Sequence, residues 1–428
     1  MLTAVVGVNW GDEGKGRMVD LLSEGYDVIC RYQGGNNAGH TVVNEKGRFI
    51  LNLLPSGVLR EETVNVMGSG MVVDLEHLCG EIKALGEKGV AITPANLKIS
   101  ARAFVCLPYH KAQDILEEER LGDKKYGSTR RGIAPVYGDK YMKKGLRLGD
   151  LLYPGTLRQK LESIMGWKNL TLRSYGSDEA SVDGTMRWLE EFGSQMLPYI
   201  TDTTEYLTAA ADAGRNILFE AQLGALRDID YGIYPYTTSS HTLASYATTG
   251  AGIPGKKLDC VIGVMKAYSS CVGEGPFTVE MSGGEATALR EAGAEYGAAT
   301  GRPRRVGGFD VPASRYGIQM QGADQIALTK LDVLSYLDKI PVCVAYEVGG
   351  KVTDCFPSGD ALVGAKPVYE YLDGWKSDIS SCRRIEDMPP EAVRYIQFIE
   401  SSVACPIKYV SVGPGREDYA IKTSWKTP

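Results

Sequence analysis

A glycine-rich segment at positions 7–16, which reads Gly-Val-Asn-Trp-Gly-Asp-Glu-Gly-Lys-Gly, is the feature that most limits how this chain can fold. A short apolar run at 3–8 precedes it, and residues 15–23 after it place Met18, Leu21 and Leu22 at helical spacing. A second apolar run follows at 26–32. Because a strand, a loop, a helix and a second strand in this order form a βαβ unit, we predict an α/β fold with a mainly parallel central sheet flanked by helices.

The composition argues against several classes of function. The 428 residues carry a net charge of −6, so the basic face that nucleic acids require is not expected. No stretch reaches the length of about 18 apolar residues that spans a membrane, and the N-terminus lacks the basic region of a signal peptide. We therefore expect a cytoplasmic protein with no nucleic-acid or membrane partner. Nine cysteines without a Cys-x-x-Cys pair predict reduced, mostly buried thiols.

The loop at 7–16 has the properties of a phosphate site. Glycines allow backbone N–H groups to close on phosphate oxygens, the helix N-terminus adds a partial positive charge, and Lys15 adds a full one. The loop is not a Walker A motif, because Asn9 replaces the first glycine and Gly16 replaces the Ser or Thr after the lysine. On spacing alone, a glycine-rich turn without a ligand is the alternative.

Asp12 and His40 are the candidate catalytic residues. A carboxylate inside an anion-binding loop indicates a bound cation or a proton transfer, so Asp12 can ligate Mg²⁺ or remove a proton from a purine. Helix capping is the structural alternative for Asp12. His40 belongs to a second glycine turn at 33–41, among small polar residues, which favours proton donation over a place in an apolar core. Because the two turns follow strands that we expect to be neighbours, their polar side chains should meet.

Further apolar runs predict strands at 216–219, 258–264, 325–329 and 341–347. Open α/β sheets bind ligands at the carboxyl ends of their strands, so we expect 9–16, 220–224 and 330–332 to converge on one crevice. Lys330 and Asp332 suit guanine, because a carboxylate accepts both N–H groups of that base while a lysine stem covers its face. The arginines at 302–305 suit a dicarboxylate or a phosphate, and a solvated charge run is the alternative.

The domain organisation follows from where these motifs lie. They extend from position 7 to position 413 and must meet in one site, and no linker rich in Pro, Gly and Ser separates them. We therefore expect residues 1–428 to form one large domain. The segment at about 105–210, rich in Arg, Lys, Glu, Trp and Leu, is expected to be a mainly helical inserted lobe.

Together the motifs resemble those of the adenylosuccinate synthetases. The pair at 10–16 and 36–42 is the most specific part, and the similarity continues at 127–133, 228–240, 302–305, 329–334 and 411–414. The resemblance implies a core like that of the P-loop NTPases with helical insertions. It also implies a homodimeric enzyme that joins IMP to L-aspartate with GTP and Mg²⁺, in the AMP branch of purine biosynthesis.

The resemblance also implies a mechanism. Asp12 would take the proton from N1 of IMP, so that O6 attacks the γ-phosphate of GTP, and His40 would donate a hydrogen bond to the developing charge. The amine of aspartate would then displace the phosphoryl group from C6. Catalysis of this kind consists of positioning and of charge stabilisation.

The binding residues implied by the resemblance fall into four groups. GTP would be held by Gly11, Asp12, Glu13, Gly14, Lys15, Gly16, Arg17, Gly39, His40, Thr41, Arg304, Lys330, Leu331, Asp332, Ser411, Val412 and Gly413. IMP would be held by Asp12, Lys15, Asn37, Ala38, Thr129, Lys143, Gln222, Thr238 and Arg302. Aspartate would be held by Thr300, Gly301, Arg302 and Arg304, and Mg²⁺ by Asp12 and the carbonyl of Gly39.

Several residues near the expected IMP and aspartate sites depart from the family pattern. The glutamine that would contact the base stands one position early, as Gln222, and Leu223 takes its place. His241 replaces an asparagine, and Pro303 replaces an arginine. Lys143 replaces the arginine that would reach across the dimer to the phosphate of the partner's IMP, and it lacks the bidentate fork.

These departures leave two other interpretations open. One is a diverged paralogue that uses GTP to join a different 6-oxopurine nucleotide or a different amino donor. The other is a GTP-binding regulatory protein without catalysis. Asp12 and His40 argue against the regulatory protein, because phosphate binding requires neither a proton acceptor nor a proton donor.

Overall fold

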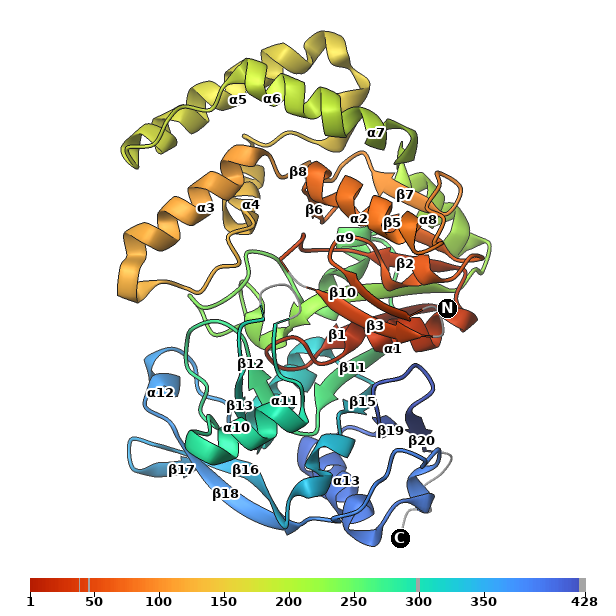
Figure 1. Cartoon of the computed structure of the whole chain (residues 1–428), viewed down its shortest axis with the longest axis vertical. Coiled ribbons are helices and arrows are strands. Elements are labelled where there is room, and N and C mark those ends of the chain that lie inside the picture. The colour runs from red at the N-terminus through yellow and green to blue at the C-terminus, as the bar shows by residue number, and fades with distance from the viewer. Residues whose placement is uncertain (38, 45–46, 298–300, 423–428) are drawn as a thin grey trace.

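The computed structural model describes residues 1–37, 39–44, 47–297 and 301–422. A ten-stranded sheet forms its centre (Figure 1). The strands of this sheet are β1 (Leu2–Gly7), β2 (Val28–Arg31), β5 (Val64–Met67), β7 (Leu97–Ser100), β9 (Ile200–Thr201), β10 (Ile217–Gly224), β11 (Cys260–Lys266), β15 (Gln325–Thr329), β19 (Ile407–Ser411) and β20 (Tyr419–Ile421). Their order is β20-β19-β15-β11-β1-β10-β2-β5-β7-β9, and only β20 at the edge is antiparallel to its neighbour. The predicted α/β class with a mainly parallel sheet is therefore confirmed.

Helices cover both faces of the sheet, and other helices pack against one another farther from it. The helices are α1 (Lys15–Leu22), α2 (Leu75–Glu87), α3 (Pro108–Leu121), α4 (Ile133–Tyr141), α5 (Pro154–Ser174), α6 (Val182–Trp188), α7 (Ser194–Met196), α8 (Thr203–Asp212), α9 (Ala247–Ala251), α10 (Gly283–Ala292), α11 (Val311–Gln321), α12 (Asp360–Val363) and α13 (Pro390–Val403). Val5 of β1 packs with Met18 of α1, whereas Ala4 and Val6 pack with α8 and α9 on the opposite face. Burial on both faces explains the continuous apolar run of β1.

The remaining strands form smaller sheets. They are β3 (His40–Asn44) with β4 (Gly47–Leu51), β6 (Val72–Val73) with β8 (Phe104–Val105), β12 (Ser269–Cys271) with β13 (Arg305–Gly307), and a four-stranded sheet of β14 (Phe309–Asp310), β16 (Lys339–Val348), β17 (Lys351–Thr353) and β18 (Lys366–Asp373). The apolar run predicted as a strand at 341–347 lies within β16. It belongs to the four-stranded sheet, because β16 pairs with β14, β17 and β18 instead of with the central strands.

The strand order corrects one expectation about the two glycine turns. β1 and β2 are not neighbours, because β10 lies between them and pairs with both. The pairing of β1 with β10 is irregular: Val5 is opposite Glu220, but Gly7 is opposite Gly224, so β10 carries extra residues at this point. Leu223 lies among these residues with a φ of 62°. Bulges of this kind redirect side chains beside functional sites, and here β10 inserts its own side chains between the two turns.

The segment from residue 105 to residue 210 contains α3 to α7 and most of α8. Figure 1 shows α5 and α6 side by side at the upper end of the molecule, beyond α3 and α4. Leu161 and Met165 of α5 belong to the same apolar cluster as Leu75 and Leu78 of α2. None of the helices in the described ranges is long and apolar enough to cross a membrane.

Candidate active site

The loop between β1 and α1 is held in shape by a carboxylate of its own. Glu13 is buried and accepts hydrogen bonds from two backbone N–H groups of the loop, at 2.8 and 3.1 Å. Its other oxygen lies 2.6 Å from the ammonium of the buried Lys15. Gly7 and Gly224 leave the space for this carboxylate, since a Cβ on either residue would lie 2.6 Å from one of its oxygens. The loop is thus pre-shaped, and Lys15 is fixed within it.

Asp12 occupies the tip of the same loop. Its φ is 59°, in the left-handed region that Asp tolerates better than most residues, and Gly11 and Gly14 beside it have φ values near 100°. Gly14 is the N-cap residue of α1, so the capping role considered for Asp12 is wrong. The Asp12 side chain is 28% exposed, and its carboxylate lies 3.0 Å from the guanidinium of Arg304. Asp12 therefore faces outward from the loop, toward the arginine segment.

His40 is buried at the start of β3, with its two ring nitrogens in different situations. Nδ1 lies 2.5 Å from the carboxylate of Glu220, which also accepts hydrogen bonds from the backbone N–H and the hydroxyl of Ser56. Nε2 is buried and has no hydrogen-bond partner among the described residues. Burial lowers the pKa of His40, while the negative charge of Glu220 opposes this effect. Glu220 thus fixes the imidazole ring and leaves Nε2 for a ligand.

The two glycine turns meet, as the sequence predicted, although their strands are not neighbours. Gly16 at the start of α1 lies directly against His40, since a Cβ on Gly16 would be 2.6 Å from the Cβ of His40. Any larger residue at this position would push the histidine away. The contact brings the loop that carries Asp12 and the turn that carries His40 to one place.

Gln222 supports the second turn from β10. Its buried side chain accepts a hydrogen bond from Arg31 and donates one to the amide oxygen of Asn37, each at 2.5 Å. The amide nitrogen of Asn37 lies 3.5 Å from the hydroxyl of Thr238. Gly34 has no room for a side chain, because a Cβ there would lie 2.4 Å from Gln222. Three predicted IMP residues are therefore joined, with Gln222 behind Asn37.

The residues predicted for guanine gather at the ends of β15 and β19. The N–H of Leu331 donates to the carbonyl of Ser411 at 3.2 Å, and Arg17 donates to the Ser411 hydroxyl at 2.9 Å. Thr329 donates to the carbonyl of Glu13 at 2.6 Å, which ties this region to the first loop. Asp332 starts a short helical turn beside them, and burial raises its pKa. The three segments expected to converge therefore do so.

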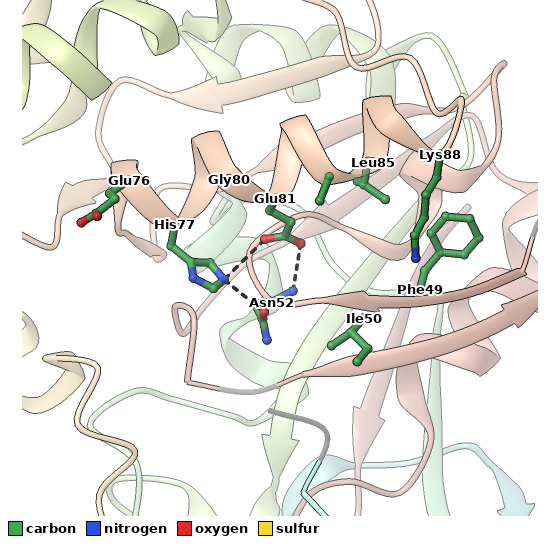
Figure 2. A pocket seen from close by; sticks show the side chains of 10 residues that line it. Phe49, Ile50, Asn52, Glu76, His77, Gly80, Glu81, Leu85 and Lys88 are labelled. Atoms are coloured by element: carbon green, nitrogen blue, oxygen red, sulfur yellow. Dashed lines mark hydrogen bonds and ion pairs between the residues drawn. The ribbon is translucent and has the colours of Figure 1, made fainter. Parts of the chain in front are cut away.

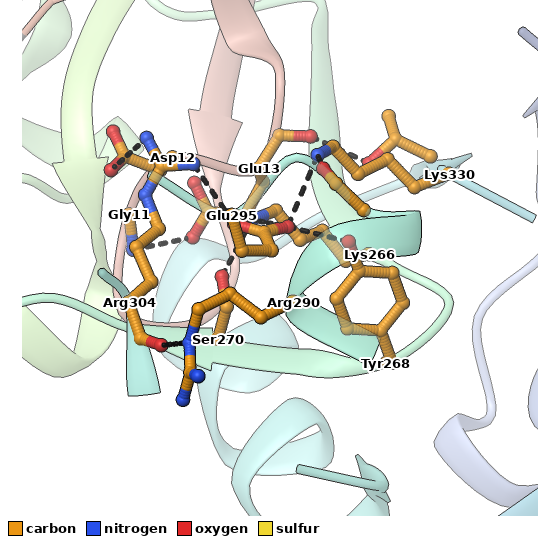
Figure 3. Close-up of polar contacts among 12 residues, drawn as sticks. Gly11, Asp12, Glu13, Lys266, Tyr268, Ser270, Arg290, Glu295, Arg304 and Lys330 are labelled. Atoms are coloured by element: carbon orange, nitrogen blue, oxygen red, sulfur yellow. Dashed lines mark hydrogen bonds and ion pairs between the residues drawn. The ribbon is translucent and has the colours of Figure 1, made fainter. Parts of the chain in front are cut away.

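A buried charge cluster lies between the guanine residues and Asp12 (Figure 3). Glu295, which is fully buried, contacts Lys266 and Arg304 at 2.8 Å and Lys330 at 3.1 Å. Although burial opposes it, the attraction of these three cations holds the pKa of Glu295 well below its usual range. Burial lowers the pKa of Lys266 to about 8.

Sequence reasoning missed two members of this machinery, and it expected Glu220 at the crevice within the segment 220–224 without giving it a role. Lys266 is the last residue of the buried strand β11, the same signal that singled out Lys330 after β15, so it could have been found. Glu295 lies in the loop after α10, where no periodic pattern marks it. Only the folded arrangement shows that it is the common partner of the surrounding cations.

The structure does not bring every predicted residue to this place. Lys143 is exposed after the end of α4, and Thr129 is exposed in the loop before α4. Arg302 pairs with Glu274 at 3.1 Å, and Gly301 beside it is exposed. Among the described residues of this chain, Lys143 and Asp12 are joined by no ion pair or hydrogen bond.

The remaining predicted residues that the structure describes lie beside His40 or after β19. Gly39 and Thr41 flank His40 and are partly exposed, and Val412 is fully buried after β19. Gly413 packs against Asp418, whose carboxylate would lie 2.8 Å from a Cβ at that position. Ala38 and Thr300 lie outside the described residues.

Two features elsewhere do not resemble a substrate site. A cavity of about 440 Å³ lies between α2 and β4 and is lined by none of the predicted residues (Figure 2). Its buried carboxylate, Glu81, accepts hydrogen bonds from the backbone N–H groups of Asn52 and Leu53, both at 2.9 Å. Glu81 therefore fixes the end of the β3–β4 hairpin that begins with His40.

Asp228, Asp230 and His241 have the spacing of metal ligands. Asp228, however, is fully buried and already accepts three hydrogen bonds from backbone N–H groups. His241 lies 3.4 Å from Asp230 and packs against the ring of Tyr246. The group therefore functions as a hydrogen-bonded turn that joins residues 228–231 to Thr242.

Comparisons with known proteins agree with this arrangement. The family model of adenylosuccinate synthetase matches residues 4–420. The chain is 43% identical over 419 residues to the adenylosuccinate synthetase of Caldanaerobacter subterraneus, covering 97% of this chain and 98% of that one. It is 47% identical to that of Gloeobacter violaceus, covering 97% and 95%. The fully ligated adenylosuccinate synthetase of Plasmodium falciparum superposes with a TM-score of 0.93, at 36% identity, over 98% of this chain and 99% of that one. This chain therefore belongs to the adenylosuccinate synthetase family, whose members are GTP-dependent ligases of purine nucleotide biosynthesis.

Proposed function

We propose that Asp12 and His40 are the catalytic residues with which this chain joins IMP to L-aspartate, using GTP and forming adenylosuccinate. The contact of Gly16 with His40 carries the proposal, because it brings a partly exposed carboxylate and a buried, unpartnered imidazole nitrogen to one place. A base and a hydrogen-bond donor at adjoining positions suit a reaction in which one oxygen is activated and then phosphorylated.

The reaction proceeds in two steps. Asp12 accepts the proton from N1 of IMP, so that O6 becomes nucleophilic and attacks the γ-phosphorus of GTP, and GDP leaves. The amine of aspartate then attacks C6 of the 6-phosphoryl nucleotide, inorganic phosphate leaves, and the amine loses a proton. His40 donates from Nε2 to the charge on O6 and on the transferred group, while Glu220 stabilises the imidazolium from Nδ1.

Mg²⁺ fits the oxygen donors that the loop and the turn present. A carboxylate and a backbone carbonyl are the hard ligands that this ion prefers, and Asp12 and Gly39 would supply them. The Asp12 carboxylate is partly exposed, and Arg304 is its ion-pair partner in the described part of the chain. When bound, Mg²⁺ would supply positive charge to the phosphates of GTP.

The substrates occupy three adjoining regions. IMP lies against Asn37, Thr238 and Lys15, with Gln222 holding Asn37 from behind, and with Ala38, Thr129 and Arg302 at its border. Guanine lies against Lys330 and Asp332, close to Ser411, Val412 and Gly413. Aspartate binds to the segment that contains Thr300, Gly301, Arg302 and Arg304, whose guanidinium groups suit its two carboxylates.

A homodimer completes the IMP site. Lys143 is exposed, and the apolar side chains of Tyr141 and Met142 next to it are 63% and 50% exposed. Exposed apolar groups beside a cation suit a subunit interface through which Lys143 reaches the IMP phosphate of the partner. We also propose a cytoplasmic location and a single domain over residues 1–428, with the helical segment at about 105–210 as its inserted lobe.

A direct assay tests the proposal. Purified protein is mixed with GTP, Mg²⁺, IMP and L-aspartate, and the absorbance near 280 nm is followed, with each component omitted in turn. We expect adenylosuccinate to form only when all four components are present. No absorbance change with IMP and L-aspartate, combined with turnover of another 6-oxopurine nucleotide or another amine, would establish the diverged paralogue instead. Phosphate release that needs no acceptor would exclude both ligases.

A further inference from the structure

One buried carboxylate connects the two ends of the proposed active site. Oε1 of Glu295 accepts hydrogen bonds from Lys266 at 2.8 Å and from Lys330 at 3.1 Å (Figure 3). Oε2 accepts from Arg304 at 2.8 Å. Lys330 belongs to the guanine region, whereas the opposite side of the Arg304 guanidinium lies 3.0 Å from Asp12. A continuous chain of charged groups therefore runs from the guanine residues to the proposed base.

The members of this chain depend on one another. Glu295 is fully buried, so its negative charge would be unfavourable without the surrounding cations. Lys266 is equally enclosed, and the side chain of Arg304 is only 12% exposed, so both cations need Glu295 as well. The hydroxyl of Tyr268 donates a further hydrogen bond to Oε1 at 2.5 Å. A change at one cation alters how strongly the carboxylate holds the others.

We propose that Glu295 is a positioning residue that couples guanine binding at Lys330 to the placement of Arg304 beside Asp12. Guanine that packs on the stem of Lys330 fixes its ammonium against Oε1, and the carboxylate held in this way keeps Arg304 in place beside Asp12. GTP thereby prepares the arginine that receives aspartate. This inference rests on the proposed function, which assigns Lys330 to guanine and Arg304 to aspartate.

The variant Glu295→Gln keeps the size of the side chain and removes its charge. We expect the KM values for GTP and for aspartate each to rise by about tenfold or more, because both cations lose an ionic partner. The KM for IMP should rise by less, about threefold at most, since Asn37 and Thr238 make no described hydrogen bond to Glu295 and Asp12 is connected to it only through Arg304. If Glu295→Gln raised all three KM values by the same factor, the role of Glu295 would be merely structural and the proposal would be overturned.

A double-mutant cycle tests the coupling itself. Lys330→Ala alone should raise the KM for aspartate by about threefold or more, although Lys330 is assigned to guanine. In the Glu295→Gln background the same lysine substitution should leave that KM unchanged, because the connection is already broken. If the double variant raised the KM for aspartate by the product of the two single effects, the coupling would be overturned. Glu280→Gln is the matched control: Glu280 pairs with Arg305, the neighbour of Arg304, and it is largely exposed, so all three KM values should stay within about twofold.

Tyr268→Phe covers the case in which Glu295→Gln does not fold. It removes one hydroxyl donor to Oε1 and keeps every charge. We expect about a threefold rise in the KM values for GTP and aspartate but not for IMP, and three unchanged values would overturn the inference. The assay of the wild type distinguishes a failure of the proposed function from a failure of the role assigned to Glu295. An inactive wild type contradicts the proposed function, whereas an active wild type with an additive cycle contradicts only the role of Glu295.

Discussion

The guanidinium of Arg304 lies 3.0 Å from the carboxylate of Asp12, so the arginine assigned to aspartate is in contact with the proposed base. The ion pair fixes the direction of the carboxylate at the tip of a loop whose backbone is in the left-handed region. It also implies that metal binding and aspartate binding both rearrange the same contact, because Asp12 and Arg304 each have a second assigned partner. Proton transfer and the binding of aspartate therefore both involve Asp12 and Arg304.

Asp12→Asn should remove the proton acceptor and keep the fold. We expect turnover to fall by more than about a hundredfold, the scale of a lost general base, because an amide cannot take the N1 proton. Asn tolerates the φ of 59° at this position, so the thermal midpoint should stay within a few degrees. The 280 nm assay and a melting curve measure both. Asp354→Asn, which alters an exposed pair with Arg315, is the control, and an Asp12→Asn enzyme within about tenfold of wild type would contradict the assignment.

The histidine pKa can be followed by NMR, because the chain has only four histidines. Burial lowers the pKa of His40 below its ordinary value, so the free imidazole should be neutral at pH 7. Phosphate charge near Nε2 favours the imidazolium, and we expect the pKa of His40 to rise when GTP and IMP are added. Buried His110, which pairs with Asp139, is the internal control and should not respond. A His40 pKa that is above 6.5 without ligands, or one that ligands leave unchanged, would refute this role.

Gln222→Met tests the hydrogen bonds behind the IMP turn. Methionine has a similar shape, but it removes the hydrogen bond from Arg31 and the one to the oxygen of Asn37, at a cost of about 1–3 kcal/mol in unfolding free energy. Arg31 then retains its bond to the carbonyl of Asn52, and the oxygen of Asn37 retains the N–H of Gly35. We expect the KM for IMP to rise by about tenfold, because Asn37 loses its orientation. Urea unfolding and steady-state kinetics give the two quantities. The exposed Gln195→Met is the matched control, and an unchanged KM for IMP would show that Gln222 does not position Asn37.

Asp332→Asn should alter the choice of nucleotide triphosphate. A carboxylate accepts from both N–H groups of guanine, whereas an amide accepts from one and donates to an oxygen, the group that xanthine carries instead. We expect the ratio of kcat/KM for GTP over XTP to fall by about tenfold or more. Asp338→Asn, at an exposed carboxylate paired with Lys376, should leave the ratio unchanged. If Asp332→Asn left it unchanged too, guanine would be recognised elsewhere.

Lys143→Ala should affect IMP alone, provided that the chain forms a dimer. We expect the KM for IMP to rise by about tenfold, because a charged contact to phosphate is lost, while the KM values for GTP and aspartate stay constant. Lys143→Arg, which restores a bidentate fork, should lower the KM for IMP or leave it unchanged. Lys144→Ala is the neighbouring control, since its ammonium lies over the ring of Trp167. Sedimentation of the wild type as a monomer at assay concentration would contradict the shared site.

The sequence predicted the local elements of the site better than the spatial order of the strands. The strand, loop and helix around Asp12 follow from a buried apolar run, positive-φ glycines and helical spacing, all of which are local properties. The expectation that β1 and β2 pair was wrong, because β10, almost two hundred residues later, is inserted between them. Local patterns carry no information about such an insertion, and neighbours along the chain are only the commonest arrangement.

The sequence also did not show what the carboxylates of Glu13 and Glu295 contact. The carboxylate of Glu13 binds the N–H groups of its own loop, which the sequence did not indicate, while its assignment to GTP stays a prediction. No periodic pattern surrounds Glu295, and its importance arises from three cations, of which Lys266 and Lys330 lie 29 and 35 residues away along the chain. The single-domain organisation with a helical inserted lobe, and the assignment of each residue to a substrate, stay predictions.

The irregular pairing of β10 has a consequence for which changes in chain length this protein can accept. Glu220 and Gln222 are two positions apart on that strand, and they bond to His40 and Asn37 of the second glycine turn. A deletion of one residue between them would move both partners at once, whereas extra residues before Ile217 would fall in the connection that follows α8. Insertions and deletions among natural or engineered relatives of this chain should therefore accumulate ahead of β10 and be absent between Glu220 and Gln222.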